Sequence, residues 1–360
     1  MGAAAATSDS VLRISGGTRA EIVMDDHGFL VGPGDPQLGM DSKVRLGAFH
    51  LDLDATTRAD VTGHFRARFD DRAANQSLSI DRASVTWKTD GILSFGAGRD
   101  TVEAGGFEFI REPELRVSAS PYWSSTRLAA FKEVADQLSV QFDLGDAGTL
   151  RVQFLDDYAK PEAVMDASGP PRSYNRFNMQ PAAIIAYQGS AGAVVPLLQL
   201  GTYDLNHSKF VVAALKFNLA ELSLEIDHTY DMRDVMLDSG SSVNHISNTR
   251  FIAEYMFRNA MQPFITLGRL AVREDGDPIF GNSPPVSGGS GPSGNADDLL
   301  SDNGREITAG IWFATPVNDL RPFLCFQYKD GDFLMDGKNL AGQTEKRDQR
   351  VGRAGLAYRF

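Results

Sequence analysis

Residues 58–70 read RADVTGHFRARFD, and in this stretch two kinds of side chain alternate strictly. One set of alternate positions carries apolar or small residues: Ala59, Val61, Gly63, Phe65, Ala67 and Phe69. The other set carries polar and mostly charged residues: Arg58, Asp60, Thr62, His64, Arg66, Arg68 and Asp70. Because successive side chains of a β-strand point to opposite faces, this stretch predicts a strand with one apolar and one charged face.

The same alternation returns along the chain, for example in residues 135–144, 221–231 and 250–258. A water-soluble sandwich also alternates, but three features favour a barrel with its apolar face in lipid and its polar face around a lumen. The polar faces are densely charged in strand after strand, and the apolar faces mix Ala and Gly with aromatic residues. The turn-rich gaps also alternate between short and long. The sequence therefore predicts an all-β fold, a closed antiparallel transmembrane β-barrel.

The alternation divides the chain into about sixteen strands, an even number as in bacterial barrels. The expected strands begin near residues 11, 42, 58, 80, 92, 135, 149, 181, 192, 208, 220, 248, 262, 305, 318 and 350. Short gaps, such as 145–148 and 218–221, are expected to be periplasmic turns. The expected long extracellular loops are residues 25–40, 101–134, 158–179, 232–247, 274–305 and 330–349. Residues 1–360 thus form one barrel domain, with residues 1–10 as an N-terminal extension.

Two of these strands fit the pattern less well. The second loses its alternation near Gly47 and Ala48, which predicts a β-bulge. Residues 194–203 are apolar on both faces, and burial of both faces at a subunit contact is one explanation.

Composition excludes several classes of protein. The 360 residues carry a formal net charge of -12 with no dominant basic stripe, which argues against a nucleic-acid partner. Cys325 is the only cysteine, so no intrachain disulfide forms. No apolar run approaches the ~20 residues that a membrane helix needs. Residues 1–10 lack the basic and long apolar regions of a signal peptide, so we expect the mature form, with that peptide removed.

The motifs of cofactor and metal chemistry are weak. The segment Gly96–Gly98 lacks the third glycine and the following helix of a dinucleotide fingerprint, and no Cys/His set has zinc spacing. We therefore expect no cofactor. Asp297, Asp298 and Asp302 in a long loop are an alternative calcium site, although acidic external loops are usually only hydrated.

Several segments resemble Gram-negative outer-membrane proteins, and in particular the sixteen-stranded trimeric general and dicarboxylate-type porins. The closing residues 355–360, GLAYRF, resemble the C-terminal signature of outer-membrane proteins, with Phe360 last and Tyr358 two before it. The porin-like segments are residues 41–47 (DSKVRLG), 82–87 (RASVTW) and 93–100 (LSFGAGRD). Residues 109–116 (FIREPELR) resemble the dicarboxylate-type porins, whereas the Pro-Glu-Phe-Gly-Gly loop motif of general porins is not reproduced.

The resemblance implies a water-filled channel in the outer membrane of a Gram-negative bacterium, through which small hydrophilic solutes and ions diffuse passively. It also implies a homotrimer in contact with membrane lipid and lipopolysaccharide, no enzymatic activity, and a third loop, residues 101–134, folded into the lumen as a constriction. One alternative is a porin selective for small organic acids such as dicarboxylates. Others are an outer-membrane hydrolase, for which residues 206–208 and 244–247 are the candidate Ser/His/Asn clusters, and a structural barrel with a plugged lumen.

The parity of the strands predicts which charges line the pore. The basic residues on the inner face are Arg13, Arg19, Arg66, Arg68, Arg82, Lys88, Arg321, Lys329, Arg353 and Arg359. The acidic residues are Asp143, Asp157, Glu221, Glu225 and Asp227 on the strands, and Glu103, Glu108, Glu112 and Glu114 on the third loop. If the two sets face each other, they create a transverse field that governs ion selectivity. Each single charge is also explained by simple solvation of the lumen wall.

Overall fold

The computed structural model describes most strands and the short turns of the chain. The described residues are 11–27, 40–57, 60–70, 77–89, 91–107, 115, 134–156, 162–164, 172–174, 182–190, 192–203, 208–237, 240–257, 260–275, 303–316, 319–334 and 344–360. The strands are β1 Val11–His27, β2 Met40–Thr56, β3 Val61–Asp70, β4 Ser77–Lys88, β5 Leu93–Thr101, β6 Val134–Asp143, β7 Thr149–Asp156, β8 Glu162–Val164, β9 Arg172–Tyr174, β10 Ala182–Gln188, β11 Val194–Tyr203, β12 Ser208–Leu219, β13 Leu222–Leu237, β14 Gly240–Tyr255, β15 Met261–Asp275, β16 Asn303–Phe313, β17 Leu320–Leu334 and β18 Thr344–Arg359.

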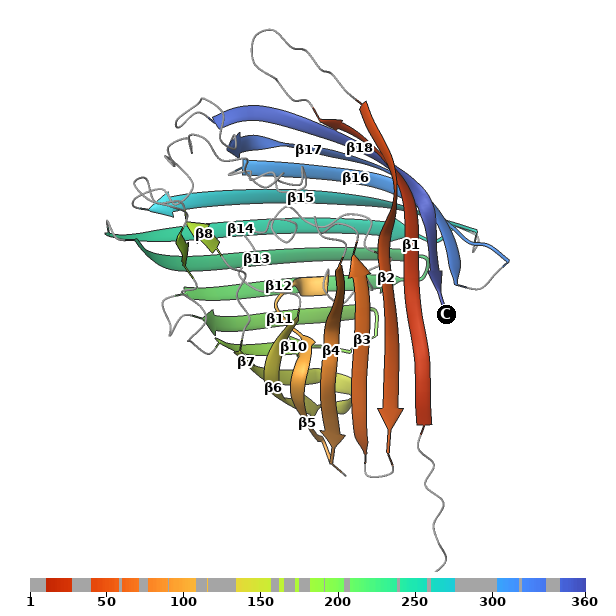
Figure 1. Ribbon diagram of the computed structural model, residues 1–360, viewed down its shortest axis with the longest axis vertical. Coiled ribbons are helices and arrows are strands. Elements are labelled where there is room, and N and C mark those ends of the chain that lie inside the picture. Colours follow the sequence, from red (N-terminus) through yellow and green to blue (C-terminus); the bar gives the residue numbers. More distant parts are fainter. Residues whose placement is uncertain are drawn as a thin grey trace, which may run out of the picture.

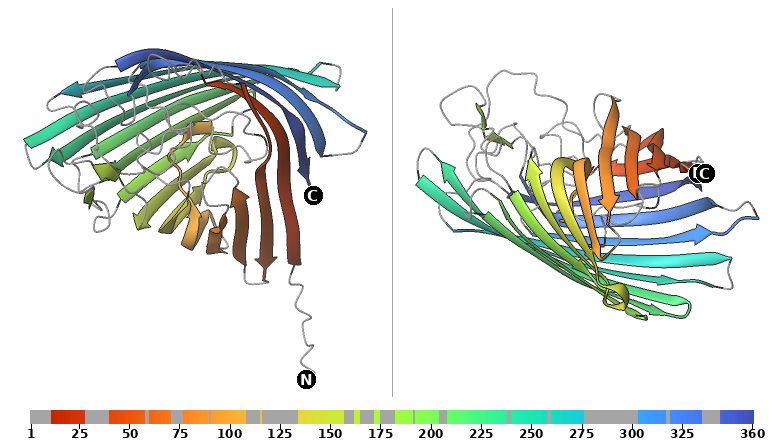
Figure 2. Two further views of the ribbon diagram at one scale, coloured as in Figure 1. Left: turned by 45° about the horizontal axis from the view of Figure 1, so that its top comes forward. Right: turned by 90° about the horizontal axis from the view of Figure 1, so that it is seen from below.

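Sixteen of these strands form one closed antiparallel barrel, in which each strand pairs with its neighbours in the chain and β18 pairs with β1 (Figure 1). β8 and β9 make a separate two-stranded hairpin between β7 and β10. The expected barrel of about sixteen strands is therefore confirmed. Figure 2 shows the strands inclined to one another as they wrap around the interior. Among the described residues, no helix has the length and apolar character needed to cross a membrane.

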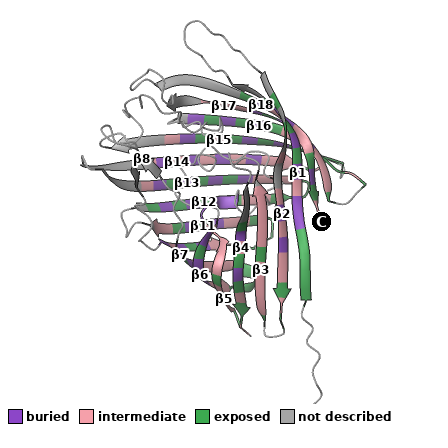
Figure 3. Ribbon diagram, in the orientation of Figure 1, coloured by how far each residue is buried: buried purple, intermediate pink, exposed green. Residues whose placement is uncertain are grey.

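Burial alternates along the strands, as Figure 3 shows on β11 to β16, but the buried side chains are largely polar and the exposed ones largely apolar, which is the reverse of a water-soluble protein. Large apolar side chains such as Leu138, Ile265 and Phe326 are exposed on the outer face. Polar side chains such as Gln153 and Thr308 are buried on the inner face. In water the exposed apolar surface would be costly, but in hydrocarbon it needs no cover, so this pattern defines a lipid-facing exterior.

The predicted β-bulge is confirmed. In the pairing of β1 with β2, Arg19 lies opposite Ala48 and Ala20 lies opposite Leu46, which leaves Gly47 as the extra residue. A second bulge lies between β3 and β4 and leaves Asp81 unpaired in the ladder. Because an extra residue reverses the parity beyond it, both bulges change which side chains reach the interior.

The expected loop at residues 232–247 is wrong. β13 continues to Leu237 and β14 starts at Gly240, so the two strands form a long hairpin in register to its tip. The expected loop at 330–349 is also too long, because β17 reaches Leu334 and β18 starts at Thr344. Strand ends that project beyond the apolar belt are wet on both faces, so no alternation marks them in the sequence.

The seam of the barrel joins the two ends of the described chain. The N–H of Gly16 donates to the carbonyl of Phe360 at 3.0 Å, and the N–H of Phe360 donates back to Gly16 at 3.1 Å. A Cβ at position 16 would lie 2.6 Å from Cζ of the Phe360 ring and 2.5 Å from the carbonyl oxygen of His50. Only glycine therefore lets the ring of Phe360 lie against β1.

Candidate functional site in the barrel interior

The segment that follows β5, residues 102–107, runs along the inside of the barrel. The N–H of Glu103 donates to Oε1 of Gln153 on β7 at 2.9 Å. The N–H of Gly106 donates to Oε1 of Gln199 on β11 at 3.0 Å. These bonds place the segment across three successive strands of the inner wall, β7, β10 and β11, and they satisfy backbone groups that have no sheet partner.

A second set of amide contacts holds the beginning of this segment. The carbonyl of Thr101 accepts hydrogen bonds from Nε2 of Gln137 at 3.0 Å and from Nε2 of Gln153 at 2.9 Å. Gln137, Gln153 and Gln199 are all buried. We refer to these three inward side chains of β6, β7 and β11 as the glutamine ladder.

Apolar packing supplements the glutamine ladder. Val102 and Ala104 join a buried cluster on the inner wall that also contains Ala135, Leu155, Ala182, Ile184, Phe210 and Val212. Phe107 packs with Leu197 of β11 and Ala214 of β12. The apolar inner face of β11 is therefore covered by this segment, which explains the two-sided apolar character of residues 194–203 without the subunit contact suggested for that face.

The opposite wall also contacts the connection between β5 and β6. Phe264, Trp312 and Phe323, on β15, β16 and β17, form a buried inward cluster, and Leu115 packs against it. Trp312 and Phe323 have ring centroids 5.0 Å apart. The expectation that the third loop folds into the lumen is thus confirmed for residues 102–107 and for Leu115.

Gly106 lies close against the inner wall at β13. Its φ is +62°, in the left-handed region. A Cβ there would lie 3.2 Å from Cγ of Asp227 on β13 and 3.3 Å from its nearer carboxylate oxygen. A glycine is favoured at this position both by the backbone conformation and by the lack of room.

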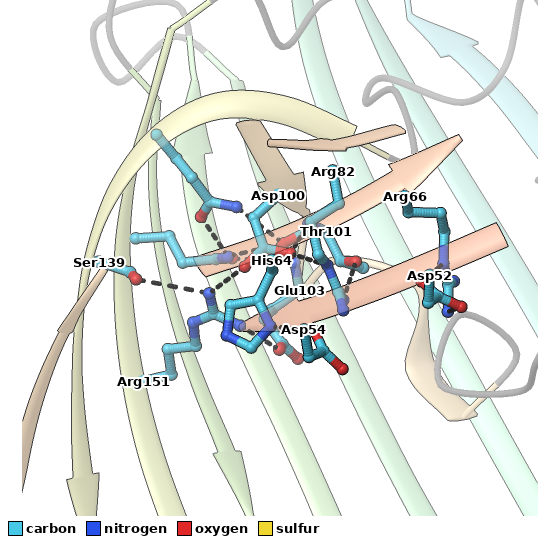
Figure 4. Close-up of polar contacts among 12 residues, drawn as sticks. Asp52, Asp54, His64, Arg66, Arg82, Asp100, Thr101, Glu103, Ser139 and Arg151 are labelled. Atoms are coloured by element: carbon cyan, nitrogen blue, oxygen red, sulfur yellow. Dashed lines mark hydrogen bonds and ion pairs between the residues drawn. The ribbon is translucent and has the colours of Figure 1, made fainter. Parts of the chain in front are cut away.

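An ion-pair cluster lies where the segment leaves the wall (Figure 4). Arg82 on β4 donates from Nε to Oδ1 of Asp100 at 2.7 Å, and from Nη2 to the hydroxyl of Thr101 at 3.2 Å. Arg151 on β7 lies on the other side, 3.4 Å from Oδ2 of Asp100 and 3.1 Å from Oε1 of Glu103. We call Arg82, Asp100, Glu103 and Arg151 the junction cluster.

Further ion pairs join neighbouring strands on the inner face of the early barrel. Arg66 binds both carboxylate oxygens of Asp52, with Nε–Oδ1 at 2.6 Å and Nη2–Oδ2 at 3.0 Å. Arg68 lies 2.9 Å from Asp81, the extra residue of the second bulge. The inner face of β2 to β5 therefore carries both signs of charge, whereas the sequence reasoning had assigned only its basic residues.

A third group closes the interior at the seam. Arg19 and Glu21 of β1 lie 3.4 Å apart, and Arg353 of β18 lies 3.6 Å from the second oxygen of Glu21. The side chains of Arg19 and Glu21 have no exposed surface. This carboxylate between two guanidinium groups links the first and last strands.

The structure places the predicted pore residues at several levels. Arg66, Arg68, Arg82, Arg353, Glu103, Glu225 and Asp227 lie on the inner wall or on the segment against it. Arg13 is exposed near the start of β1, and Lys88 is at the end of β4. Asp143 and Glu221 are exposed beside short turns, where Asp143 accepts a hydrogen bond from the N–H of Gly145. Glu108, Glu112, Glu114 and Asp157 lie outside the described residues.

Several members of the interior were missed by sequence reasoning, namely Asp52, Asp81, Asp100, Arg151 and the glutamine ladder. Strand parity alone would place Arg151 and Gln153 inward, because they alternate with the apolar residues Leu150, Val152 and Phe154. Asp81 was hidden by the bulge, which changes the parity between it and Arg82.

The other candidate sites receive no support from geometry. Among the described residues, no group of three or more His, Cys, Asp or Glu side chains is arranged to hold a metal ion. Asp297, Asp298 and Asp302 lie outside the described residues, as do Asn206 and His207. His245 contacts the hydroxyl of Tyr230, with Nδ1–Oη at 2.6 Å.

The closed ring, the apolar exterior and the charged interior define the chain as a transmembrane β-barrel. No protein-family model matches the sequence, and no curated protein matches it. Solved outer-membrane proteins share its fold. The outer membrane channel DcaP of Acinetobacter baumannii superposes with a TM-score of 0.68 at 12% identity, covering 98% of this chain and 97% of that one.

Two further structures agree with this fold. OmpT, an outer membrane protein of Vibrio cholerae, has a TM-score of 0.62 at 10% identity over 98% of both chains. OmpF of Salmonella typhi, solved in complex with daunomycin, has a TM-score of 0.53 at 14% identity over 97% of both chains. At such low identity the likeness concerns the fold.

Proposed function

We propose that this protein is a porin of the bacterial outer membrane, a channel for passive diffusion of small hydrophilic solutes and ions. The observation that carries the proposal is the inverted barrel, in which ionised side chains such as Arg66 and Asp100 surround the interior while apolar side chains face outward. Only a closed barrel satisfies every backbone group of a β structure in hydrocarbon. A sixteen-stranded ring is wide enough to leave an aqueous lumen.

The segment 102–107 and the junction cluster are the proposed constriction. The segment occupies part of the lumen, so solutes would pass beside Arg82, Asp100, Glu103 and Arg151. Fixed charges at a narrow point select ions by sign and orient dipolar solutes. Because arginines and carboxylates are paired here, we expect weak ion selectivity. The proposed role is that of a channel and not of an enzyme.

The proposed assembly is a homotrimer surrounded by outer-membrane lipid. Its support is the fold shared with OmpF and with OmpT of Vibrio cholerae, which has been solved in a trimer form. Selectivity for small dicarboxylates is the alternative within the same class. It is favoured by Arg82 and Arg151, which lie on either side of one carboxylate and would offer two guanidinium groups to a competing dianion.

Current through planar bilayers tests the proposal. The purified protein should give discrete conductance steps, and a salt gradient should give a small reversal potential. Its electrophoretic mobility should change on heating, as a folded barrel unfolds. Absence of conductance from heat-modifiable protein would contradict the channel and favour a plugged structural barrel. Current interruptions that appear only with dicarboxylates would favour the selective alternative.

A further inference from the structure

Two arginines lie side by side on the outer face of the barrel. Arg269 of β15 is directly opposite Arg305 of β16 in the antiparallel register. Both side chains are exposed, and both belong to the alternate positions that carry Leu267 and Ile307 outward. Within the part of the chain that the structure describes, neither guanidinium has an ion-pair partner within 4 Å.

The depth of this pair follows from the strand beneath it. On β15 the outward positions from Met261 to Leu267 are apolar, and Arg269 is the first charged one. Met261 to Arg269 spans eight residues, which is about 26 Å along a strand and about 20 Å along the membrane normal at a tilt of about 40°. An apolar belt is about 25 Å tall, so Arg269 lies near its extracellular boundary.

Neighbouring side chains support this depth. Tyr230 is exposed one outward position above this level on β13, where aromatic residues of an interfacial girdle are expected. Thr249 lies opposite Arg269 on β14, and its hydroxyl contacts Nδ1 of His228 at 2.8 Å.

Asp330 lies opposite Arg305 on β17 and is the one described carboxylate that flanks the pair in the register.

Two adjacent guanidinium groups on a lipid-facing sheet need an anion. Like charges directly opposite on neighbouring strands repel. At the boundary of the hydrocarbon a single charged side chain costs little, so the mutual repulsion is the main reason for a counter-ion. At this boundary the available groups are Asp330, which can balance one of the two charges, and lipid headgroups. A phosphate has the geometry for bidentate contact with arginine.

We propose that Arg269 and Arg305, with the hydroxyl of Thr249 beside them, form a binding site for the headgroup phosphate of an anionic lipid in the outer leaflet. The acyl chains of that lipid lie along the apolar positions Leu267, Ile307 and Ile265 below. The site rests on the membrane location proposed above but not on conduction through the lumen.

Another outward arginine provides the contrast. Arg99 of β5 also faces outward near the long-loop end of its strand, but it lies 3.6 Å from Asp136 on β6. Its charge is already paired, so it should not recruit a phosphate. Arg99 therefore serves as a matched control.

Binding of lipid A to the detergent-solubilised barrel tests this site, with dephosphorylated lipid A as the comparison ligand. We expect the double variant R269Q/R305Q to lose about tenfold or more of its affinity for lipid A, since two charge-assisted contacts are removed. The variant R99Q should bind like the wild type. R269K/R305K keeps the charges but loses the bidentate contacts, so its affinity should lie between those of the wild type and R269Q/R305Q.

The site is contradicted if R269Q/R305Q binds lipid A as the wild type does, or if R99Q is weakened equally. It is also contradicted if dephosphorylation leaves wild-type affinity unchanged, because the acyl chains alone would then explain binding. Heat-modifiable mobility verifies the fold of each variant, and if the double glutamine variant does not fold, R269Q and R305Q are each compared with R99Q. Conductance of the same samples separates this site from the channel proposal, because loss of lipid binding should leave conductance intact.

Discussion

The N–H of Gly106 binds Oε1 of Gln199 across the interior of the barrel, although the two residues are 93 positions apart in the chain. This contact joins the segment after β5 to β11, four strands away around the ring. The segment is therefore held against strands that come much later in the sequence. Its position depends on amide side chains rather than on sheet pairing, and each of these bonds can be tested singly.

Removal of the amide at Gln199 should loosen the segment. In Gln199→Leu the N–H of Gly106 loses its acceptor while it remains buried, which costs about 1–3 kcal/mol. We expect a noisier single-channel current and a lower unfolding midpoint in urea. The control is Gln141→Leu, because Gln141 faces the same interior from β6 without a hydrogen bond to any described residue. Equal noise in both variants would show that the glutamine ladder does not hold the segment.

The junction cluster should control the sign of the ion selectivity. Asp100→Asn removes the carboxylate shared by Arg82 and Arg151, so an excess positive charge remains and permeation should shift toward anions. Arg151→Gln should shift it toward cations. The measurement is the reversal potential in a salt gradient, and shifts of the same sign in both variants would contradict this assignment.

The Arg66–Asp52 pair should act in the same way on the early strands. Arg66→Ala and Arg68→Ala each remove one positive charge from the inner wall beside a carboxylate, so cation preference should rise. R99Q changes an arginine on the outer face and should not alter the reversal potential. Unchanged selectivity in both inner variants would show that these residues only solvate the wall.

The free-energy cost of a charged side chain on the lipid-facing surface should depend on its depth in the membrane. Ile265 lies midway up the outer face of β15, and Ile265→Lys should lower the free energy of unfolding in vesicles by about 2–4 kcal/mol. Val194 begins β11 beside a short turn, so Val194→Lys should cost only about 0–1 kcal/mol. Denaturation in lipid vesicles measures both, and equal costs would contradict the assigned depth.

Comparison of Gly106 with Gly192 separates the effect of backbone conformation from the effect of steric crowding around an added Cβ. Both have positive φ, at +62° and +56°, but a Cβ meets the carboxylate of Asp227 only at Gly106, whereas nothing lies within 4 Å of one at Gly192. Each change to alanine places a Cβ in the left-handed conformation, which costs about 1–2 kcal/mol. We expect Gly106→Ala to change the unitary conductance as well, and Gly192→Ala to leave it unchanged.

The fold was predictable from the sequence because one face of each strand contacts lipid and the other faces the aqueous interior. Lipid and water force an alternation such as that of residues 58–70, and its repetition implies a closed ring of about sixteen strands. The strand ends at Leu237 and Gly240 were not predictable, because water surrounds both faces there and imposes no pattern.

The interior was predictable only in part. Parity identified Arg66 and Arg82 as inward, but their partners depend on cross-strand register, which no local pattern encodes. The path of residues 102–107 depends on contacts with β7 and β11, far away in the sequence. For the same reason the role of Gln153 and Gln199 emerged only from the structure.

The seam between β1 and β18 has a consequence for how the molecule is made. Gly16 binds Phe360 and Gly17 pairs with Arg359, so the ring is completed by the contacts with the greatest sequence separation in the barrel. Loop-closure entropy must be overcome before such a contact contributes, and distant strand pairing is slow. Until that moment β1 and β18 are open edges whose unpaired backbone groups can bind other chains, so the unclosed barrel is the form most exposed to aggregation.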